Sequence, residues 1–228
     1  MIFRQLFDQD SSTYTYLLGE KISQEAILID PVLEHVPEYL ALLQSLQLKL
    51  KFTLDTHTHA DHITGAGVLR EKTRCKTVCG ANGGADCVDL RLKDGQTLQF
   101  GNIGLKVLET PGHTNCSVSY LIQDRVFTGD ALLINGCGRT DFQNGSAEIL
   151  WESVTGKLFK LPPDTLIYPS HDYNQRCVST IAEQIDLNPR FAGKTKADFV
   201  ELMKNLKLDL PKRIHEALPL NAKCGMKA

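Results

Sequence analysis

Short apolar runs with alternating polarity occupy the first quarter of the chain. Residues 13–18 and 25–30 are β-branched and aliphatic, and a Gly-Glu-Lys turn separates them, which predicts a β-hairpin. Residues 36–46 begin next to a proline and carry leucines at helical spacing. Residues 50–55 then form another apolar strand. This order predicts a βαβ unit, in which the helix crosses over between parallel strands.

The remainder of the chain continues to alternate strands with helices. Helices are predicted at 63–73 and at 146–160, the second with Ser146 as its N-cap. After residue 171 the pattern predicts a helix, a loop, a second helix and an irregular tail. Further strands are predicted at 76–79, 105–109, 117–122, 125–128 and 164–168. We expect an α/β fold with two mixed sheets flanked by helices, as one domain spanning 1–228 with a short helical C-terminal part at about 175–228.

The most chemically dense stretch is 56–62, which reads Thr-His-Thr-His-Ala-Asp-His. His57 and His59 are two residues apart in extended chain and point the same way. Asp61 and His62 are expected on the first turn of the following helix. Neutral imidazoles and carboxylates are ligands for Zn, Fe and Mn. A lone buried histidine is ordinarily structural, but four such groups in one loop favour a metal site.

Two further histidines and one aspartate also follow predicted strands. His113 and His171 each come after a strand and a proline, and Asp130 ends a strand. Because strand ends converge in space, these side chains are expected to join the 56–62 loop. His35 and His215 lie in helix-flanking or surface contexts, and we expect both to be ordinary.

Composition excludes several classes of function. The net charge is −2 and no basic run is present, so neither nucleic acid nor an anionic membrane surface is an expected partner. No apolar stretch reaches the roughly 18 residues of a membrane span, and no signal sequence opens the chain. We therefore expect a soluble intracellular protein. Seven cysteines without a Cys-x-x-Cys pair favour reduced thiols, and Cys75 and Cys79 lack a nearby histidine for a metal site.

The histidine and aspartate spacing resembles the metallo-β-lactamase superfamily, whose fold is an αββα sandwich with a metal site along one edge. Within that superfamily the chain resembles the persulfide dioxygenases, also called sulfur dioxygenases, over nearly its whole length. Residues 136–142, Gly-Cys-Gly-Arg-Thr-Asp-Phe, are the most diagnostic stretch of the resemblance. Other matching stretches include 26–33, 58–65 and 188–190.

The resemblance implies oxidation of glutathione persulfide by dioxygen and water to sulfite and glutathione. One Fe(II) per chain is implied, with His57, His113 and Asp130 as its ligands. A facial set of two histidines and one carboxylate leaves coordination positions open for reactants. His59, Asp61, His62 and His171 are implied in the second shell, and His59 and His171 are also catalytic candidates. Arg139, Tyr173 and Arg190 are the candidates for binding glutathione.

Two other functions are compatible with the same residues. A glyoxalase II-like hydrolase of hydroxyacylglutathione thioesters would use all seven metal-site residues to bind two metal ions. Only 57 residues follow His171, fewer than the helical glutathione-binding part that glyoxalase II usually carries. A noncatalytic metal-binding or redox-sensing protein would instead use Cys137, although packing in a glycine-flanked turn is the simpler interpretation of that thiol.

The sequence leaves oligomeric state open, and a homodimer is compatible with it. We expect a cytoplasmic location if the protein is bacterial and the mitochondrial matrix if it is a processed eukaryotic form.

Overall fold

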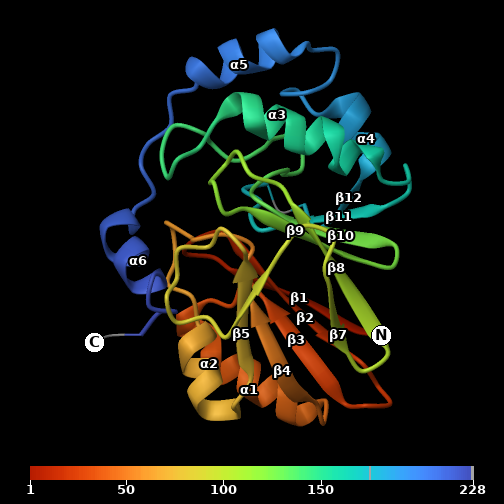
Figure 1. Ribbon diagram of the computed structural model, residues 1–228, viewed down its shortest axis with the longest axis vertical. Coiled ribbons are helices and arrows are strands. Elements are labelled where there is room, and N and C mark those ends of the chain that lie inside the picture. The colour runs from red at the N-terminus through yellow and green to blue at the C-terminus, as the bar shows by residue number, and fades with distance from the viewer. Residues whose placement is uncertain (175, 227–228) are drawn as a thin grey trace.

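The computed structural model describes residues 1–174 and 176–226, which form two facing sheets with helices on their outer sides (Figure 1). The first sheet has the order β1 (Ile2–Asp8), β2 (Thr13–Gly19), β3 (Glu25–Ile29), β4 (Lys49–Leu54), β5 (Lys76–Gly80) and β6 (Leu90–Leu92). The second has the order β12 (Ser179–Thr180), β11 (Leu166–Pro169), β10 (Arg125–Gly129), β9 (Val118–Ile122), β8 (Ile103–Glu109) and β7 (Thr97–Phe100). Both sheets are mixed, as expected.

The first half of the chain follows the predicted connections. Strands β2 and β3 pair antiparallel, with Tyr16 opposite Ile29. Helix α1 (Val36–Ser45) then crosses over, and β4 pairs parallel with β3. Strand β1 was not predicted, although it pairs antiparallel with β2 along its whole length. It is an edge strand without a fully buried residue, so its hydrophobic pattern is weak.

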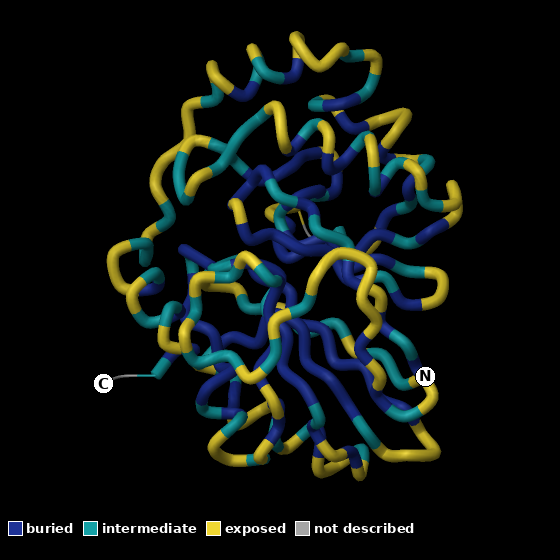
Figure 2. The backbone as a smooth tube through the Cα atoms, in the orientation of Figure 1, coloured by how far each residue is buried: buried dark blue, intermediate teal, exposed yellow. Residues whose placement is uncertain are grey.

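Three apolar layers hold the fold together. Between the sheets lie the fully buried rings of Tyr16, Phe100, Tyr120 and Phe127. The first sheet is covered by α1 and α2 (Ala66–Thr73) through a second cluster. The second sheet is covered by α3 (Ala147–Gly156), α4 (Ile181–Leu187) and α5 (Lys196–Lys204) through a third. Figure 2 shows the strands as the buried centre of the molecule. Burial on both sides of each sheet defines the αββα sandwich.

Two predicted helices are shorter in the structure. Helix α2 begins at Ala66, so the expectation that Asp61 and His62 form its first turn is wrong. The chain just before it bonds to the segment after β3 instead, where the Leu33 amide donates to the Ile63 carbonyl at 2.8 Å. Helix α3 has the expected Ser146 N-cap, and it ends at Gly156 before a 3₁₀ turn at Leu158–Lys160.

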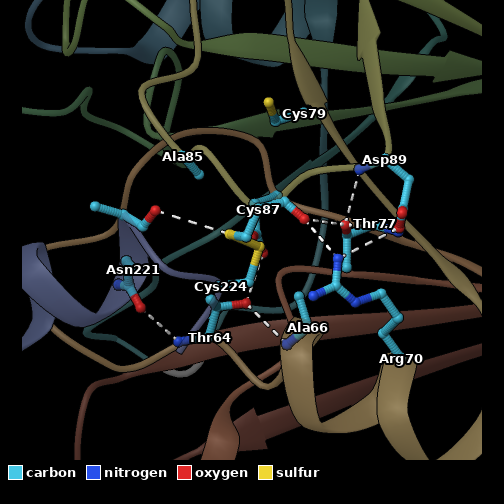
Figure 3. Close-up of a disulfide and its surroundings, with 12 residues drawn as sticks. Thr64, Ala66, Arg70, Thr77, Cys79, Ala85, Cys87, Asp89, Asn221 and Cys224 are labelled. Atoms are coloured by element: carbon cyan, nitrogen blue, oxygen red, sulfur yellow. Dashed lines mark hydrogen bonds and ion pairs between the residues drawn. A yellow bond between two sulfur atoms is a disulfide. The ribbon is translucent and has the colours of Figure 1, made fainter. Parts of the chain in front are cut away.

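The C-terminal part returns to the edge of the first sheet. Helix α6 (Ile214–Asn221) lies apart from α3–α5, beside the loops at the ends of β4 and β5 (Figure 1). There Cys224 forms a disulfide with Cys87 (Figure 3). The expectation of reduced thiols is wrong for this pair, because 137 residues separate them and only the path of α6 brings them together. Among the described residues, no helix is long and apolar enough to span a membrane.

Candidate metal centre

The predicted histidines and Asp130 meet at one edge of the sandwich. His57 follows β4, His113 follows β8, Asp130 follows β10 and His171 follows β11. All four line a cavity of about 560 Å³. The convergence follows from the topology, because β10 and β11 run parallel and so end on the same side of their sheet.

His57, His113 and Asp130 could hold a metal ion together. One ligand atom from each lies within 4.8 Å of the other two. The Nε2 atom of His113 is 3.6 Å from Asp130 Oδ2, and Asp130 Oδ1 is buried without a hydrogen-bond partner in the part of the chain that the structure describes. A buried oxygen without a partner is costly unless a ligand completes it. Two imidazoles and one carboxylate form the donor set of a facial triad, so these residues fit Fe(II).

The orientation of His57 is set by Asp30 through Thr56. The Thr56 hydroxyl donates to Asp30 Oδ2 at 2.9 Å, so its oxygen is free to accept from His57 Nδ1 at 3.0 Å. This bond places the ring proton on Nδ1 and leaves Nε2 as the metal-binding nitrogen. Burial, together with the neighbouring His59 and His113, holds the pKa of His57 well below its usual range. The ring is therefore neutral, as a metal ligand must be.

His113 is oriented by the diagnostic glycine-flanked loop. Its Nδ1 donates to the Arg139 carbonyl at 2.7 Å, which again leaves Nε2 for a metal. A Cβ at Gly138 would lie 2.6 Å from His113 Nδ1. Gly129, at φ +55°, lets the end of β10 pass close to Thr56, where a Cβ would lie 2.8 Å from the hydroxyl oxygen. These glycines therefore permit the close approach of the loops that carry the three candidate ligands.

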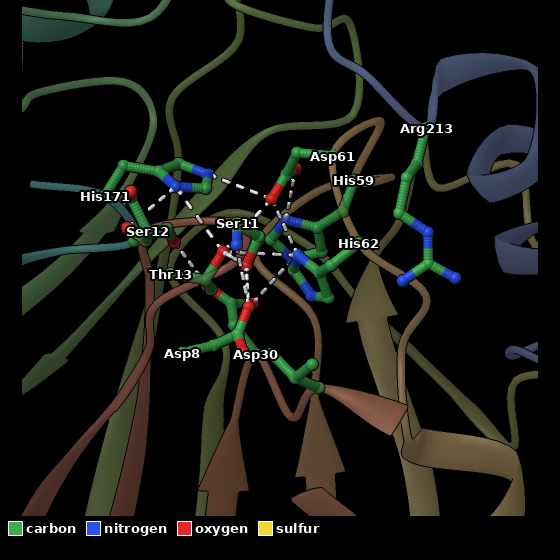
Figure 4. Close-up of polar contacts among 12 residues, drawn as sticks. Asp8, Ser11, Ser12, Thr13, Asp30, His59, Asp61, His62, His171 and Arg213 are labelled. Atoms are coloured by element: carbon green, nitrogen blue, oxygen red, sulfur yellow. Dashed lines mark hydrogen bonds and ion pairs between the residues drawn. The ribbon is translucent and has the colours of Figure 1, made fainter. Parts of the chain in front are cut away.

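A second cluster lies beside the first and contains His59, Asp61 and His62, whose ligand atoms are also within 4.8 Å of one another. His62 Nδ1 is 2.9 Å from Asp61 Oδ2. His171 Nε2 faces Asp61 Oδ2 at 3.5 Å (Figure 4). The same nitrogen lies 3.7 Å from Asp130 Oδ1, so His171 lies between the two clusters. The structure thus brings together all seven residues that were predicted for the site.

Electrostatics distinguish His59 from the other histidines. Its Nε2 lies 3.1 Å from Oδ1 of the fully buried Asp30. Although burial lowers the pKa of His59, the charge of Asp30 raises it to about 10. A carboxylate beside one ring nitrogen is also the usual partner of a metal-binding histidine, and Asp30 leaves His59 Nδ1 on the side of Asp61, 4.0 Å from its Oδ1.

The candidate glutathione residues also line the large cavity. Tyr173 is 70% exposed, and its ring stacks on His171 with the centroids 6.1 Å apart. Each guanidinium nitrogen of Arg139 donates within the protein, two of them to the Asp141 carboxylate at 2.6 Å and the third to the Asp209 carbonyl. Arg190 donates to the Cys137 carbonyl at 2.6 Å. Both arginines therefore already have structural partners.

Cys137, His35 and His215 were expected to have no part in the site chemistry, and each has a structural or surface environment. Cys137 is 2% exposed, and burial raises its pKa to about 11, which makes it an inert thiol. His35 forms an ion pair with Asp8 at 2.8 Å. His215 is exposed and lies on α6.

Sequence reasoning missed three residues that organise the loop between β4 and α2, residues 55–65, which we call the metal loop. Asp30 directly follows β3 as Asp130 directly follows β10, so the same strand-end argument could have found it. Thr56 directly precedes the first histidine and was counted only as part of the run. Asn221 binds the backbone of His59 and His62 from 159 or more residues away, and no local pattern indicates that contact.

Comparisons with known proteins were made for both sequence and structure. Residues 9–171 match the model of the metallo-beta-lactamase superfamily. Human persulfide dioxygenase ETHE1, a mitochondrial protein, is 47% identical over 99% of this chain and 89% of its own length. The crystal structure of ETHE1 from Myxococcus xanthus has a TM-score of 0.98 and 53% identity, and the match covers 99% of this chain and 100% of that one. A hydroxyacylglutathione hydrolase from Rhodopseudomonas palustris is 35% identical over 72% of this chain and 64% of its own length.

Proposed function

This chain belongs to the persulfide dioxygenase family of the metallo-beta-lactamase superfamily, and from that membership we propose that it oxidises glutathione persulfide. The proposed reaction combines glutathione persulfide, dioxygen and water to give sulfite and glutathione, at one Fe(II) per chain. The likeness to persulfide dioxygenases over nearly the whole chain carries the reaction class. The grouping of His57, His113 and Asp130 supports the metal position.

The number of metal ions per chain is inferred from the family, because the structure contains a second group, His59, Asp61 and His62, beside the first. A hydrolase with two metal ions needs the second cluster as ligands, including His59 as a neutral imidazole. In this protein the carboxylate of Asp30 lies 3.1 Å from His59 Nε2, an arrangement that is compatible with either role of His59. The donor set alone does not select iron, since zinc binds such ligands more tightly in the usual affinity order. The identity of the metal is therefore inferred from the family.

Iron, when bound, supplies the redox chemistry that lets dioxygen react with a sulfur anion. The protein supplies geometry around it. His57, His113 and Asp130 would hold the ion, and all three line the 560 Å³ cavity in which the reactants would bind. His171 adjoins this space, and although burial lowers its pKa, the charges of Asp130 and Asp61 raise it above the usual value. We assign it the role of orienting Asp130, whose Oδ1 lies 3.7 Å from His171 Nε2.

We propose that the glutathione moiety binds in the same cavity, near its opening. Its two carboxylates require donors, and Arg190 and Tyr173 line the cavity. Arg139 lines it too, but its guanidinium binds Asp141 and the backbone at Leu208 and Asp209. We therefore propose that Arg139 contributes to substrate binding indirectly, by holding residues 208–209 at the cavity.

Offering one preparation two glutathione substrates tests the proposed reaction class. Glutathione persulfide should give sulfite with consumption of oxygen, whereas lactoylglutathione should be cleaved slowly if at all. Rapid thioester cleavage without oxygen uptake would instead establish the hydrolase. That alternative has support in the 35% identity to a hydroxyacylglutathione hydrolase, although the match leaves about a quarter of this chain uncovered.

A further inference from the structure

The last turn of α6 and the residues after it pack against the metal loop and form hydrogen bonds with its backbone. We call residues 221–225 the C-terminal clasp. Asn221 is 4% exposed, and its side-chain amide donates to the carbonyls of His59 at 2.8 Å and His62 at 2.9 Å. Its amide oxygen accepts from the Thr64 backbone at 2.9 Å (Figure 3). One side chain therefore satisfies three buried backbone groups of an irregular loop.

The clasp packs closely against the start of α2. The Cys224 carbonyl accepts from the Gly67 amide at 2.9 Å. A Cβ at Gly225 would lie 1.9 Å from the Thr64 carbonyl oxygen, and one at Gly67 would lie 2.6 Å from the Cys224 oxygen. These contacts leave no room for a side chain between the clasp and the metal loop. A displacement of the clasp would therefore change the packing and backbone hydrogen bonds of residues 59–67.

The Cys87–Cys224 disulfide is the one covalent restraint on the clasp within the described chain. Helix α6 itself buries only Ala217 and Asn221, and an ion pair between Arg213 and Glu34 at 2.6 Å adds an exposed contact. Such a short helix with few buried residues has little local stability of its own. The disulfide therefore contributes strongly to holding Asn221 in position.

The loop that carries Cys87 also reaches the metal loop. A cavity of about 20 Å³ is lined by Gly83, Ala85 and Val88 from this loop together with His57, His59 and Asn221. This is room for about one water molecule. The 81–89 loop and the clasp thus both lie beside the metal loop, and the disulfide links them to each other.

We propose that the clasp is a thiol-sensitive element that positions the metal loop. With the disulfide closed, Asn221 holds His59 and His62, and the neighbouring His57 stays in place to bind its metal. Reduction releases the clasp, loosens 57–67 and accelerates loss of the metal. The inference rests on the proposed function only in its choice of glutathione as the physiological thiol, because glutathione is a product of that reaction.

The exchange step balances with two thiols. Cys87 is the more accessible partner, since Cys224 is only 2% exposed. A glutathione thiolate attacks the Cys87 sulfur, the Cys87–Cys224 bond breaks, and Cys224 leaves as a thiolate that takes up a proton. A second glutathione thiolate attacks the mixed disulfide and releases glutathione disulfide, which leaves Cys87 reduced. Two glutathione molecules are oxidised and one protein disulfide is reduced.

The test compares the oxidised protein, the dithiothreitol-reduced protein and the Cys87→Ser variant. Cys177→Ser serves as the matched control, because Cys177 is an exposed free cysteine outside the clasp. Hydrogen exchange of the metal-free protein is measured over 57–67, and release of bound iron to a chelator is timed. We expect faster exchange and about ten- to a hundredfold faster iron release in the reduced protein and in Cys87→Ser, with the control unchanged.

Asn221→Asp separates positioning from a general loss of stability. It keeps the acceptor for Thr64 and removes both donors, so we expect faster iron release even with the disulfide closed. Equal rates of hydrogen exchange and of iron release in the oxidised and reduced proteins would overturn the inference. So would an Asn221→Asp variant that releases iron at the rate of the unaltered protein. A Cys87–Cys224 disulfide that does not form in glutathione redox buffers would overturn it as well. None of these readouts depends on persulfide turnover, so they stand apart from a failure of the proposed function.

Discussion

At the scale of single residues, hydrogen bonds with neighbouring groups orient the two candidate histidine ligands without a bound metal. His57 and His113 each donate from Nδ1, to the Thr56 hydroxyl and to the Arg139 carbonyl, so both present Nε2. The acceptors differ in kind, since one belongs to a side chain and the other to the backbone. Only the first can be removed by substitution without altering the chain path.

Thr56→Val should weaken metal binding while the protein stays folded. The change keeps the side-chain shape and removes the hydroxyl between Asp30 and His57. We expect about a tenfold loss of iron affinity, which is the usual size for an outer partner of a histidine ligand. Competition with a chelator measures it, and Thr58→Val in the same loop is the control. Unchanged affinity would show that the backbone alone orients His57.

Substitutions at Arg139 and Asp141 distinguish two ways of binding glutathione. If Arg139 acts by holding the 208–209 segment, Arg139→Ala and Asp141→Asn should both raise the KM for glutathione persulfide, by about tenfold for the arginine, with iron retained. The reason is that Asp141 fixes the guanidinium at 2.6 Å. If Arg139 touches substrate directly, Asp141→Asn frees the guanidinium and KM stays level or falls. Steady-state kinetics on iron-matched preparations decide between them.

Residue types and spacing were sufficient to find the seven-residue cluster, because strand ends converge in any sheet of this kind. They could not show what each guanidinium binds. Arg139 sits in a glycine-rich loop typical of ligand contact, yet its partners Leu208 and Asp209 are about 70 residues away. Partners that distant depend on tertiary packing, which no local pattern encodes.

At the scale of elements, regular strands and helices were easier to predict than their ends. The hairpin β2–β3 and the crossover through α1 follow from alternation and helical spacing. The start of α2 was misplaced because backbone bonds to 31–33 hold residues 63–65 out of the helix. Edge strand β1 was missed because partial burial weakens its pattern.

The contact between β1 and α1 should make stability depend on pH. Burial lowers the pKa of His35, but the carboxylates of Asp8 and Glu38 raise it above the usual value of 6.5. The raised value stabilises the fold fully below about pH 6.5 and no longer does so once the pH exceeds the folded-state pKa. Asp8 has a lowered pKa and stays ionised throughout this range.

His35→Gln should therefore lower the free energy of unfolding at pH 6 by about 0.5–1 kcal/mol and leave it unchanged at pH 9. Urea unfolding at the two pH values measures the difference. His215→Gln is the control, because His215 is exposed and has no ion pair among the described residues. An equal loss at both pH values would mean that His35 stabilises by packing.

At the scale of the whole molecule, the two sheets and their helix layers give a frame whose C-terminal end returns to the metal loop. The sandwich was predictable from the order of elements and from the family resemblance. The return of α6 and the disulfide were not predictable, because Cys87 and Cys224 are 137 positions apart and the whole second sheet lies between them in the chain. Cysteine count alone favoured reduced thiols.

The central claim is that one iron per chain, held by His57, His113 and Asp130, oxidises a persulfide. Oxygen uptake with glutathione persulfide, followed as iron is added to metal-free protein, tests it most directly. The rate should rise in proportion to bound iron and level off at about one iron per chain, with one sulfite released per dioxygen. Protein that is fully active with two zinc ions and consumes no oxygen would contradict it.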